Sequence, residues 1–364
     1  MPKSTSSSTL QSRASKSKRP KDTSFHQQKM AAVQPIMSPT TIIPTLLLIG
    51  LVFVPLGIIQ LVASSRTQEY VFDYTSCPEG SEYQQVEQNG QVFEMKKENG
   101  VCSIRFTTEK ALGRPVYMYY RLTNFYQNNR LYSRSLSYAQ LKGDAVPLED
   151  LAKDCTPLLG PEGEKDNDGK PVVYYPCGLV PNSIFIDSIS GMRDAQGNYY
   201  SFPAKNISWR ADNVIVQPTK YRLDQVRAPP YWRNRADVDP ATGKYRTLPD
   251  LGLDERFLNW IRLSGLPTFR KLYGKCTHKI PPGTYTISIQ DRYDVVKFQG
   301  TKSVIISEAT FLGGKSSFMG IAYVVVGGLL LVLGLLFLVK QCMSPRIMGD
   351  VRYLPWFRNL EIIN

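Results

Sequence analysis

The sequence contains very little histidine, and this absence excludes several kinds of active site. Only His26 and His278 occur in its 364 residues. No clustered histidine metal site is possible, and any triad that uses a histidine would depend on His278 alone. We expect His278, which lies beside Cys276 and Lys279, to be an ordinary surface residue.

Two short motifs that resemble ligand-binding loops each fail at a required position. Residues 164–169 resemble the start of a calcium loop, but Tyr175 stands at the twelfth position, where a bidentate carboxylate is needed. Residues 313–316 resemble the end of a phosphate-binding loop, but Ala309 stands where the first glycine should be. We therefore predict no catalytic residue, no metal and no cofactor, and a protein that is not an enzyme.

Charged residues are missing from two long segments, residues 30–65 and 316–339. Each contains an apolar run of about 20 residues, the length that crosses a ~30 Å hydrocarbon core as a helix. The sequence predicts transmembrane helices over residues 42–64 and 316–339. The mixed, tyrosine-rich segment 65–315 between them is predicted to form one large domain on one side of the membrane.

The basic residues outside these spans predict the orientation. The first 29 residues carry seven lysines and arginines against one acid, and the last 25 carry four. Because basic flanks stay on the cytosolic side, we expect cytosolic tails over residues 1–41, basic and disordered, and 340–364. A cleaved signal peptide ending near residues 63–65 is the alternative, but cleavable signals have shorter apolar stretches. The net charge of +13 is thus concentrated where it meets anionic lipid, and it does not indicate nucleic-acid binding.

Cysteine and glycosylation patterns agree with a lumenal or extracellular domain. Four of the six cysteines lie in its first half, and Asn206-Ile207-Ser208 is a glycosylation acceptor. These four cysteines are Cys77, Cys102, Cys155 and Cys177. Four cysteines allow three connectivities, of which the sequential one closes two loops of about 25 residues, each stabilising by about 3 kcal/mol. We expect Cys276 to be a buried free thiol, and Cys342 to be either palmitoylated or unmodified.

The large domain has the pattern of an antiparallel sheet protein, most simply a β-sandwich. Aromatic and β-branched runs are separated by turn signals such as Asn89-Gly90 and Asn99-Gly100. The predicted strands are Val116–Leu122, Val172–Tyr175, Tyr285–Gln290 and Val304–Ser307. One helix is predicted where apolar residues repeat from Leu253 towards Ser264, before Pro267.

Glycines recur at heptad spacing in both predicted spans, which places them on one face of each helix. They are Gly50 and Gly57 in the first span and Gly320, Gly327 and Gly334 in the second. Such a face lets another helix approach closely, and we hypothesise docking against the helices of a larger membrane partner. The alternative is that glycine is simply common in membrane helices.

Several ordered segments of the chain resemble one known family, the accessory β-subunits of type IV P-type ATPases, which are lipid flippases. This family is named for cell-division-cycle and ligand-effect-modulator genes. The most specific matches are Phe125–Arg130, Tyr132, Ser133–Ser135, Gln140–Gly143, Pro176–Leu179, Asn182–Phe185, Asp187, Ile207–Trp209, Asp212, Leu266–Tyr273, Phe311–Lys315 and Phe318–Tyr323. Only Cys77 and Cys102 lie near the start of the domain, where animal members have more cysteines, so the chain resembles a fungal member. It has one sequon where relatives often have several, so we expect folding to depend less on glycans.

The resemblance implies an asymmetric β-sandwich with loop insertions and a non-catalytic role. Members of this family bind the ATPase as a heterodimer, and the pump needs them to leave the endoplasmic reticulum and complete its cycle of moving phospholipid to the cytosolic leaflet. The chain would then reside in the endoplasmic reticulum and in the Golgi, endosomes or plasma membrane. Loss of a Cys155–Cys177 disulfide would retain it in the endoplasmic reticulum.

Three other classes of protein share this topology. A two-pass ligand-gated channel subunit would need polar pore-lining residues, which the spans lack. A membrane-tethered ectoenzyme would need a catalytic constellation that one lumenal histidine does not readily supply. A ligand-binding receptor is compatible with the fold class alone.

Overall fold

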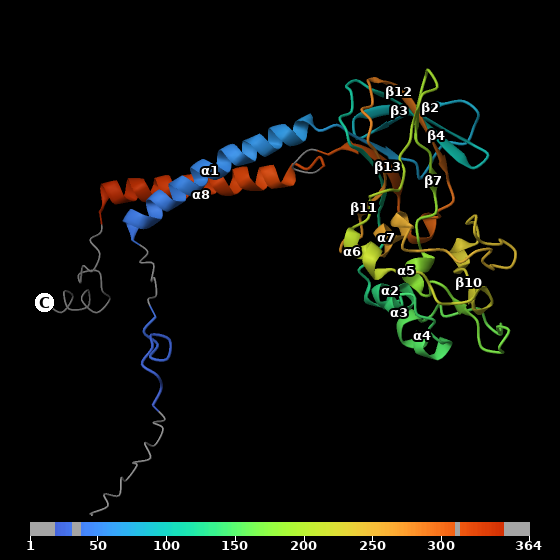
Figure 1. Cartoon of the computed structure of the whole chain (residues 1–364). Helices are drawn as coiled ribbons and strands as arrows, with labels where there is room; N and C mark the ends of the chain where they lie inside the picture. Colours follow the sequence, from blue (N-terminus) through green and yellow to red (C-terminus); the bar gives the residue numbers. More distant parts are fainter. Residues whose placement is uncertain (1–18, 31–37, 310–313, 346–364) are drawn as a thin grey trace, which may run out of the picture. The chain divides into compact units, whose positions relative to one another are not determined.

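A computed structural model describes residues 19–30, 38–309 and 314–345 of the chain (Figure 1). The outer parts of both predicted tails, residues 1–18 and 346–364, lie outside the described residues, as do 31–37 and 310–313. The two long helices are α1 (Pro39–Arg66) and α8 (Phe318–Met343). Between them the strands are β1 (Glu69–Asp73), β2 (Gln84–Gln88), β3 (Gln91–Glu98), β4 (Val101–Thr108), β5 (Val116–Leu122), β6 (Val173–Tyr174), β7 (Ser188–Ile189), β8 (Met192–Asp194), β9 (Tyr199–Tyr200), β10 (Val226–Arg227), β11 (Phe269–Cys276), β12 (Gly283–Gln290) and β13 (Lys302–Glu308).

Short helices occupy the insertions between these strands. They are α2 (Arg130–Arg134), α3 (Tyr138–Leu141), α4 (Leu148–Cys155), α5 (Leu179–Asn182), α6 (Arg210–Ile215) and α7 (Glu255–Ile261), with 3₁₀ turns at Leu223–Gln225, Pro230–Trp232 and Val296–Phe298. The described chain divides into two compact parts. Residues 56–322 contain every strand, and the other part contains most of α1 and α8.

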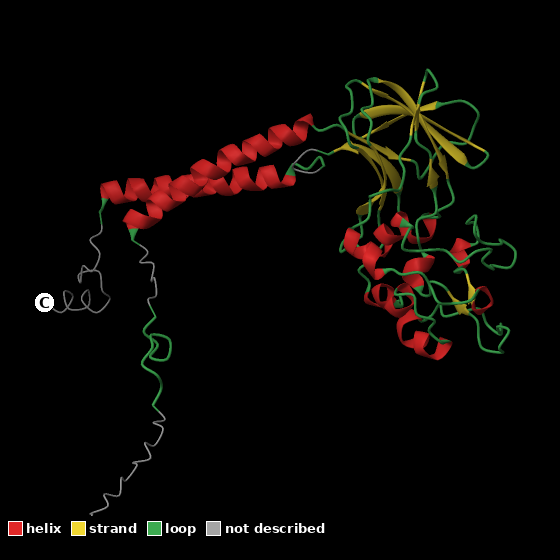
Figure 2. Cartoon of the chain, in the orientation of Figure 1, coloured by secondary structure: helices red, strands yellow, loops and turns green. Residues whose placement is uncertain are grey.

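Two sheets form one half of the large domain, and the short helices gather in the other half (Figure 2). One has the strand order β1-β13-β5-β11, and the other has the order β2-β3-β4-β12-β8-β9 with β7 also paired to β12. Phe72 of the first sheet packs against Phe93 and Phe106 of the second, with ring centroids 5.0 and 4.5 Å away. A mainly antiparallel β domain between two apolar helices, as predicted from the sequence, is confirmed.

Strand β5 shows how the local sequence specifies this sheet. Its alternate residues Val116, Met118, Tyr120 and Leu122 are buried, as expected for a strand whose two faces differ in environment. It pairs antiparallel with β13 on one side and β11 on the other. Its bounds match the predicted strand because both the apolar period and the β-branched and aromatic composition agree there.

Strand β6 departs from the antiparallel prediction. Its two residues pair parallel with Val226 and Arg227 of β10, outside both main sheets. A short apolar run specifies an extended backbone but not the direction of its partner, which here comes from an insertion about 50 residues further along the chain.

The predicted helix before Pro267 is shorter than its apolar pattern. Asp254 caps the amino end of α7, accepting a 3.1 Å hydrogen bond from the backbone N–H of Phe257. Leu253 therefore precedes the helix, and its side chain is 79% exposed, so the prediction that it belongs to the buried face is wrong. Ser264 also lies outside α7, which ends at Ile261.

Pairing between the first and last strands brings the two ends of the large domain together. β1 and β13 are antiparallel neighbours, with Glu69 opposite Ser307 and Asp73 opposite Ser303. The segment that follows α1 and the segment that leads towards α8 are therefore joined by one ladder of backbone hydrogen bonds.

A buried ion cluster joins β13 to the residues that flank β7 and β12. Lys302, at the start of β13, donates through Nζ to the carboxylates of Asp187 (2.9 Å) and Asp291, and to the carbonyl oxygen of Tyr293. Asp187 also accepts from the Tyr74 hydroxyl at 2.8 Å. The side chains of Lys302 and Asp187 are 3% and 0% exposed. Burial, followed by the neighbouring Asp187 carboxylate, raises the pKa of Tyr74 well above its ordinary value.

Replacing Lys302 by methionine should therefore destabilise the domain strongly. Asp187 would keep its neutral donors but lose its cation, and breaking a buried pair costs about 3–5 kcal/mol. Lys96→Met is the matched control, because Lys96 forms a surface pair with Glu98 at 3.3 Å, which contributes about 0–1 kcal/mol. Denaturant unfolding followed by tryptophan fluorescence would measure both. Equal costs for the two variants would contradict this account of the cluster.

Candidate functional site

Helices α1 and α8 are both long and apolar enough to cross a membrane. They contain 28 and 26 residues, and at ~1.5 Å per residue each exceeds the ~30 Å of a hydrocarbon core. α1 contains Pro44 and Pro55 within its length. Helix α1 extends beyond the predicted span 42–64 at both ends, and α8 begins and ends later than the predicted span 316–339.

The five predicted packing glycines lie where α1 and α8 touch each other. All five are buried, although many of their neighbours on these helices are exposed. A Cβ atom added to Gly50 would lie 2.7 Å from Cγ of Leu331, and one added to Gly334 would lie 2.8 Å from Cδ2 of Leu47. The glycine faces are therefore occupied by the other helix of the same chain, so a partner helix would have to contact a different face.

Gly320, Gly327 and Gly57 complete this contact. A Cβ on Gly327 would meet Cβ of Phe53 at 2.9 Å, and a Cβ on Gly320 would lie 3.1 Å from the carbonyl oxygen of Gly57. Gly328 differs, because a Cβ there would meet nothing within 4 Å. The close approach of the α1 and α8 backbones thus depends on Gly327 and not on Gly328.

The four cysteines in the first half of the large domain form two disulfides with the sequential pairing. Cys77 bonds to Cys102 of β4, and Cys155 at the end of α4 bonds to Cys177. Cys276 is a buried free thiol whose pKa is raised by burial, and Cys342 is free and exposed.

The predicted glycosylation acceptor lies on a loop whose backbone binds one carboxylate. Asn206 is exposed, and its backbone N–H donates to Glu255 at 2.8 Å. The backbone N–H groups of Ile207 and Ser208 donate to the same carboxylate. Partial burial opposes ionisation of Glu255, but these backbone donors together hold its pKa below the ordinary value. Glu255, the first residue of helix α7, thereby fixes the sequon loop.

The other end of α7 is held by a buried lysine. Lys271 donates through Nζ to the carbonyl oxygens of Asn259 (2.9 Å), Trp260 (3.3 Å) and Arg262. These carbonyls are at the end of the helix, where cations are favoured. Burial, and secondarily Arg262, lowers the pKa of Lys271 to about 7.

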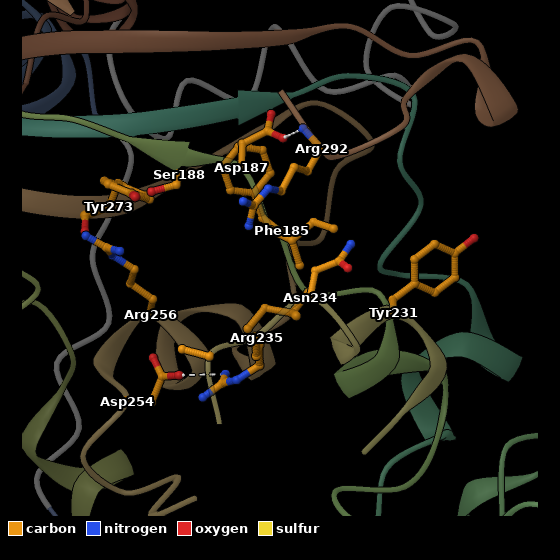
Figure 3. Close-up of a pocket in the computed structure, with 13 residues that line it drawn as sticks. Phe185, Asp187, Ser188, Tyr231, Asn234, Arg235, Asp254, Arg256, Tyr273 and Arg292 are labelled. Carbon is orange, nitrogen blue, oxygen red and sulfur yellow. Dashed lines mark hydrogen bonds and ion pairs between the residues drawn. The ribbon is translucent and has the colours of Figure 1, made fainter. Parts of the chain in front are cut away.

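A cleft of about 460 Å³ opens in the large domain beside α7 (Figure 3). Arg235, Arg256 and Arg292 line it, together with the aromatic rings of Phe185, Tyr231 and Tyr273. These residues come from five separate stretches of sequence, and the sequence patterns did not predict the cleft. No group of acidic, histidine or cysteine residues suited to a metal ion occurs among the residues that the structure describes.

A family model matches residues 60–347, most of the chain, and its description is the CDC50 and LEM3 (ligand-effect modulator 3) family. The chain belongs to the CDC50/LEM3 family. It is 33% identical to the yeast protein named phospholipid-transporting ATPase accessory subunit CRF1, over 94% of this chain and 90% of that protein. It is 34% identical to ALA-interacting subunit 3 of Arabidopsis thaliana (94% and 92%), and 33% identical to bovine cell cycle control protein 50A (89% of each).

Several residues in the segments that resemble the CDC50/LEM3 family have clear structural roles. Asn129 caps α2, and its side chain accepts from the backbone N–H of Leu131 at 2.9 Å. Gln140 is fully buried and accepts from the N–H of Cys177 at 2.9 Å. Gly178 has a φ of +101°, and a Cβ there would collide with the backbone of Ser135. These matching residues therefore cap or pack the short helices between β5 and β7. The segment Phe311–Lys315 lies partly outside the described residues.

Replacing Gly327 by leucine should separate α1 from α8, whereas Gly328→Leu should not. The distance can be followed by crosslinking cysteines placed at Phe53 and Tyr323, whose rings lie 5.1 Å apart, in a Cys342→Ser background. We expect Gly327→Leu to slow disulfide formation markedly, because its side chain has no space. Equal crosslinking rates in the two leucine variants would show that the helices do not depend on this contact.

Replacing Glu255 by alanine should destabilise the sequon loop by about 1–3 kcal/mol at neutral pH, because its backbone donors lose their acceptor. Since the folded-state pKa of Glu255 is depressed, this stabilisation is present above its ordinary pKa of 4.5 and is lost as the pH falls below it. Thermal unfolding at pH 7 and at pH 4 would measure the difference. Glu149→Ala, which removes another first-turn acid, is the control. If the destabilisation by Glu255→Ala did not shrink at low pH, the ionised Glu255 carboxylate would not be what holds the sequon loop.

Proposed function

We propose that this chain is the non-catalytic accessory subunit of a phospholipid-transporting P-type ATPase. One observation carries the proposal: the yeast protein named an accessory subunit of such an ATPase matches 94% of this chain, which includes both long helices and the large domain. A relative that matched only the β domain would have suggested a shared fold, whereas this match extends over the whole architecture.

The proposed topology places both termini in the cytosol and residues 65–315 in the lumen or outside the cell. The basic residues before α1, and Lys340 near the end of α8, support this orientation. The two disulfides and the exposed Asn206 support an oxidising compartment for the large domain. Asn206 is the proposed glycan attachment site.

Transport itself is assigned to the partner. Between Pro39 and Ser65, and between Phe318 and Val339, neither helix contains an acidic or basic residue with which to bind a headgroup within the membrane. In this proposal, the pair of helices packs beside the transmembrane bundle of the ATPase, with an outward face such as that of Gly328 available for contact. The large domain covers the lumenal loops of the pump.

The proposed role includes export of the pump from the endoplasmic reticulum and completion of its phosphorylation cycle. A folded lumenal domain suits such a role, because its stability depends on disulfides that form in that compartment. The chain would then accompany the ATPase to the Golgi, endosomes or plasma membrane.

Affinity isolation of the tagged chain in mild detergent tests the proposal. We expect a stoichiometric partner of well over 100 kDa that is phosphorylated by ATP at an aspartate and hydrolyses ATP when phospholipid is added. A stable oligomer of this chain alone, with no such partner, would overturn the proposal.

Loss of the Cys155–Cys177 disulfide should block export. Replacing both residues by serine should cost about 2–5 kcal/mol and retain the chain, with its partner, in the endoplasmic reticulum. Cys276→Ser is the control, because this thiol is free. Sensitivity of the Asn206 glycan to endoglycosidase H would report the location. Normal maturation of the double variant would contradict the assigned role of this disulfide.

A further inference from the structure

The cleft beside α7 has the features of a small-anion site. Its three arginines differ in whether neighbouring carboxylates neutralise their charge. Arg235 is ion-paired with both Asp237 and Asp254, each at 3.1 Å. Its guanidinium also lies over the Trp232 ring. Arg235 is therefore a fixed part of the wall, because its charge is already matched by the acids around it.

Arg292 is different, because its guanidinium has no hydrogen bond or ion pair with any residue that the structure describes. Its backbone N–H donates to Asp187 at 2.6 Å, which fixes the main chain at the cleft while the exposed side chain remains available. The Asp187 carboxylate does not neutralise the Arg292 guanidinium, because this carboxylate is buried and already paired with Lys302.

Arg256 presents a second guanidinium with unused donors. Its Nε donates to the carbonyl oxygen of Tyr273 at 3.0 Å, and its guanidinium carbon lies 3.6 Å from the centroid of the Tyr273 ring. This stacking orients the group, and its two terminal nitrogens have no partner among the described residues. Arg256 and Arg292 lie on two sides of the same cavity (Figure 3).

The surroundings add further donors and a second opening. Asn234 and Ser188 line the cleft with a side-chain amide and a hydroxyl. An adjoining cleft of about 430 Å³ shares Arg235 and Arg292 and adds the exposed Arg246. The acids that line the main cleft are already ion-paired, Asp187 with Lys302 and Asp254 with Arg235.

We propose that this cleft binds a phosphate group carried by a small molecule, held by Arg256 and Arg292. A single arginine fork satisfies both oxygens of a carboxylate, whereas two forks and a side-chain amide match the larger oxygen set of a phosphate. The cavity volume of about 460 Å³ falls in the range of small-molecule sites and exceeds what a bare phosphate fills. Phe185 and Tyr231 provide the apolar wall against which the remainder of the ligand packs.

Free phosphate compounds and phospholipid headgroups share this chemistry, so the test includes both. The full chain, purified in a non-ionic detergent, is titrated by calorimetry with inorganic phosphate and with glycerophosphocholine. We expect saturable binding of at least one probe, weakened by added salt. Tighter binding of the diester supports a headgroup ligand, and tighter binding of inorganic phosphate supports a free phosphate compound. Failure of both probes to bind would overturn the proposal.

Two variants and a control assign the site. Arg292→Gln should weaken binding by about tenfold or more without affecting folding, because this exposed side chain has no partner to lose. Arg256→Gln should weaken binding similarly, with thermal unfolding measured alongside because it also loses its contact with Tyr273. Arg210→Gln removes an exposed arginine on α6 and should bind as the unmodified chain does. Unchanged affinity in Arg292→Gln would refute the proposal. None of these outcomes depends on whether an ATPase binds the chain.

Discussion

The pairing of β1 with β13 is the constraint on which the rest of the architecture depends. The chain leaves the first long helix, forms more than 200 residues of sheet and insertions, and returns to the strand next to the one where it began. Closing so long a loop is entropically costly, and the cost is offset by the ladder, by the interlocking rings of Phe72, Phe93 and Phe106, and by the Lys302 cluster. Because the domain begins and ends on neighbouring strands, both of its connections to the membrane helices leave from one place.

The buried charged groups of this protein stabilise its secondary structure. Its charged residues are concentrated in the large domain and the tails, and those that are buried have partners that hold secondary structure in place. Lys271 and Asp254 hold the two ends of α7, and Glu255, at its first residue, fixes the sequon loop. This short helix therefore contacts both the loop of the predicted glycan acceptor and the arginine-lined cleft, so we expect a change at either one to affect the other through α7.

Sequence patterns predicted the parts of the molecule that local periodicity specifies. β5 followed from alternating apolar residues, and the Asn89-Gly90 turn followed from two residues that both adopt positive φ (52° and 72°). The start of α7 was misplaced because Leu253 fits the apolar period, although Asp254 is the cap. The parallel partner of β6, the intramolecular use of the glycine faces and the cleft were not predicted. Each depends on residues far apart in sequence, such as Arg256 and Arg292, whose meeting is decided by the tertiary fold.

The proposed function connects this architecture to a partner ATPase whose activity needs this chain. The most direct measurement is phospholipid-stimulated ATP hydrolysis by the co-isolated ATPase in lipid vesicles, with and without this chain. The account predicts that hydrolysis is lost when the chain is absent and returns when it is co-expressed with the ATPase. Equal hydrolysis by the ATPase alone would contradict it.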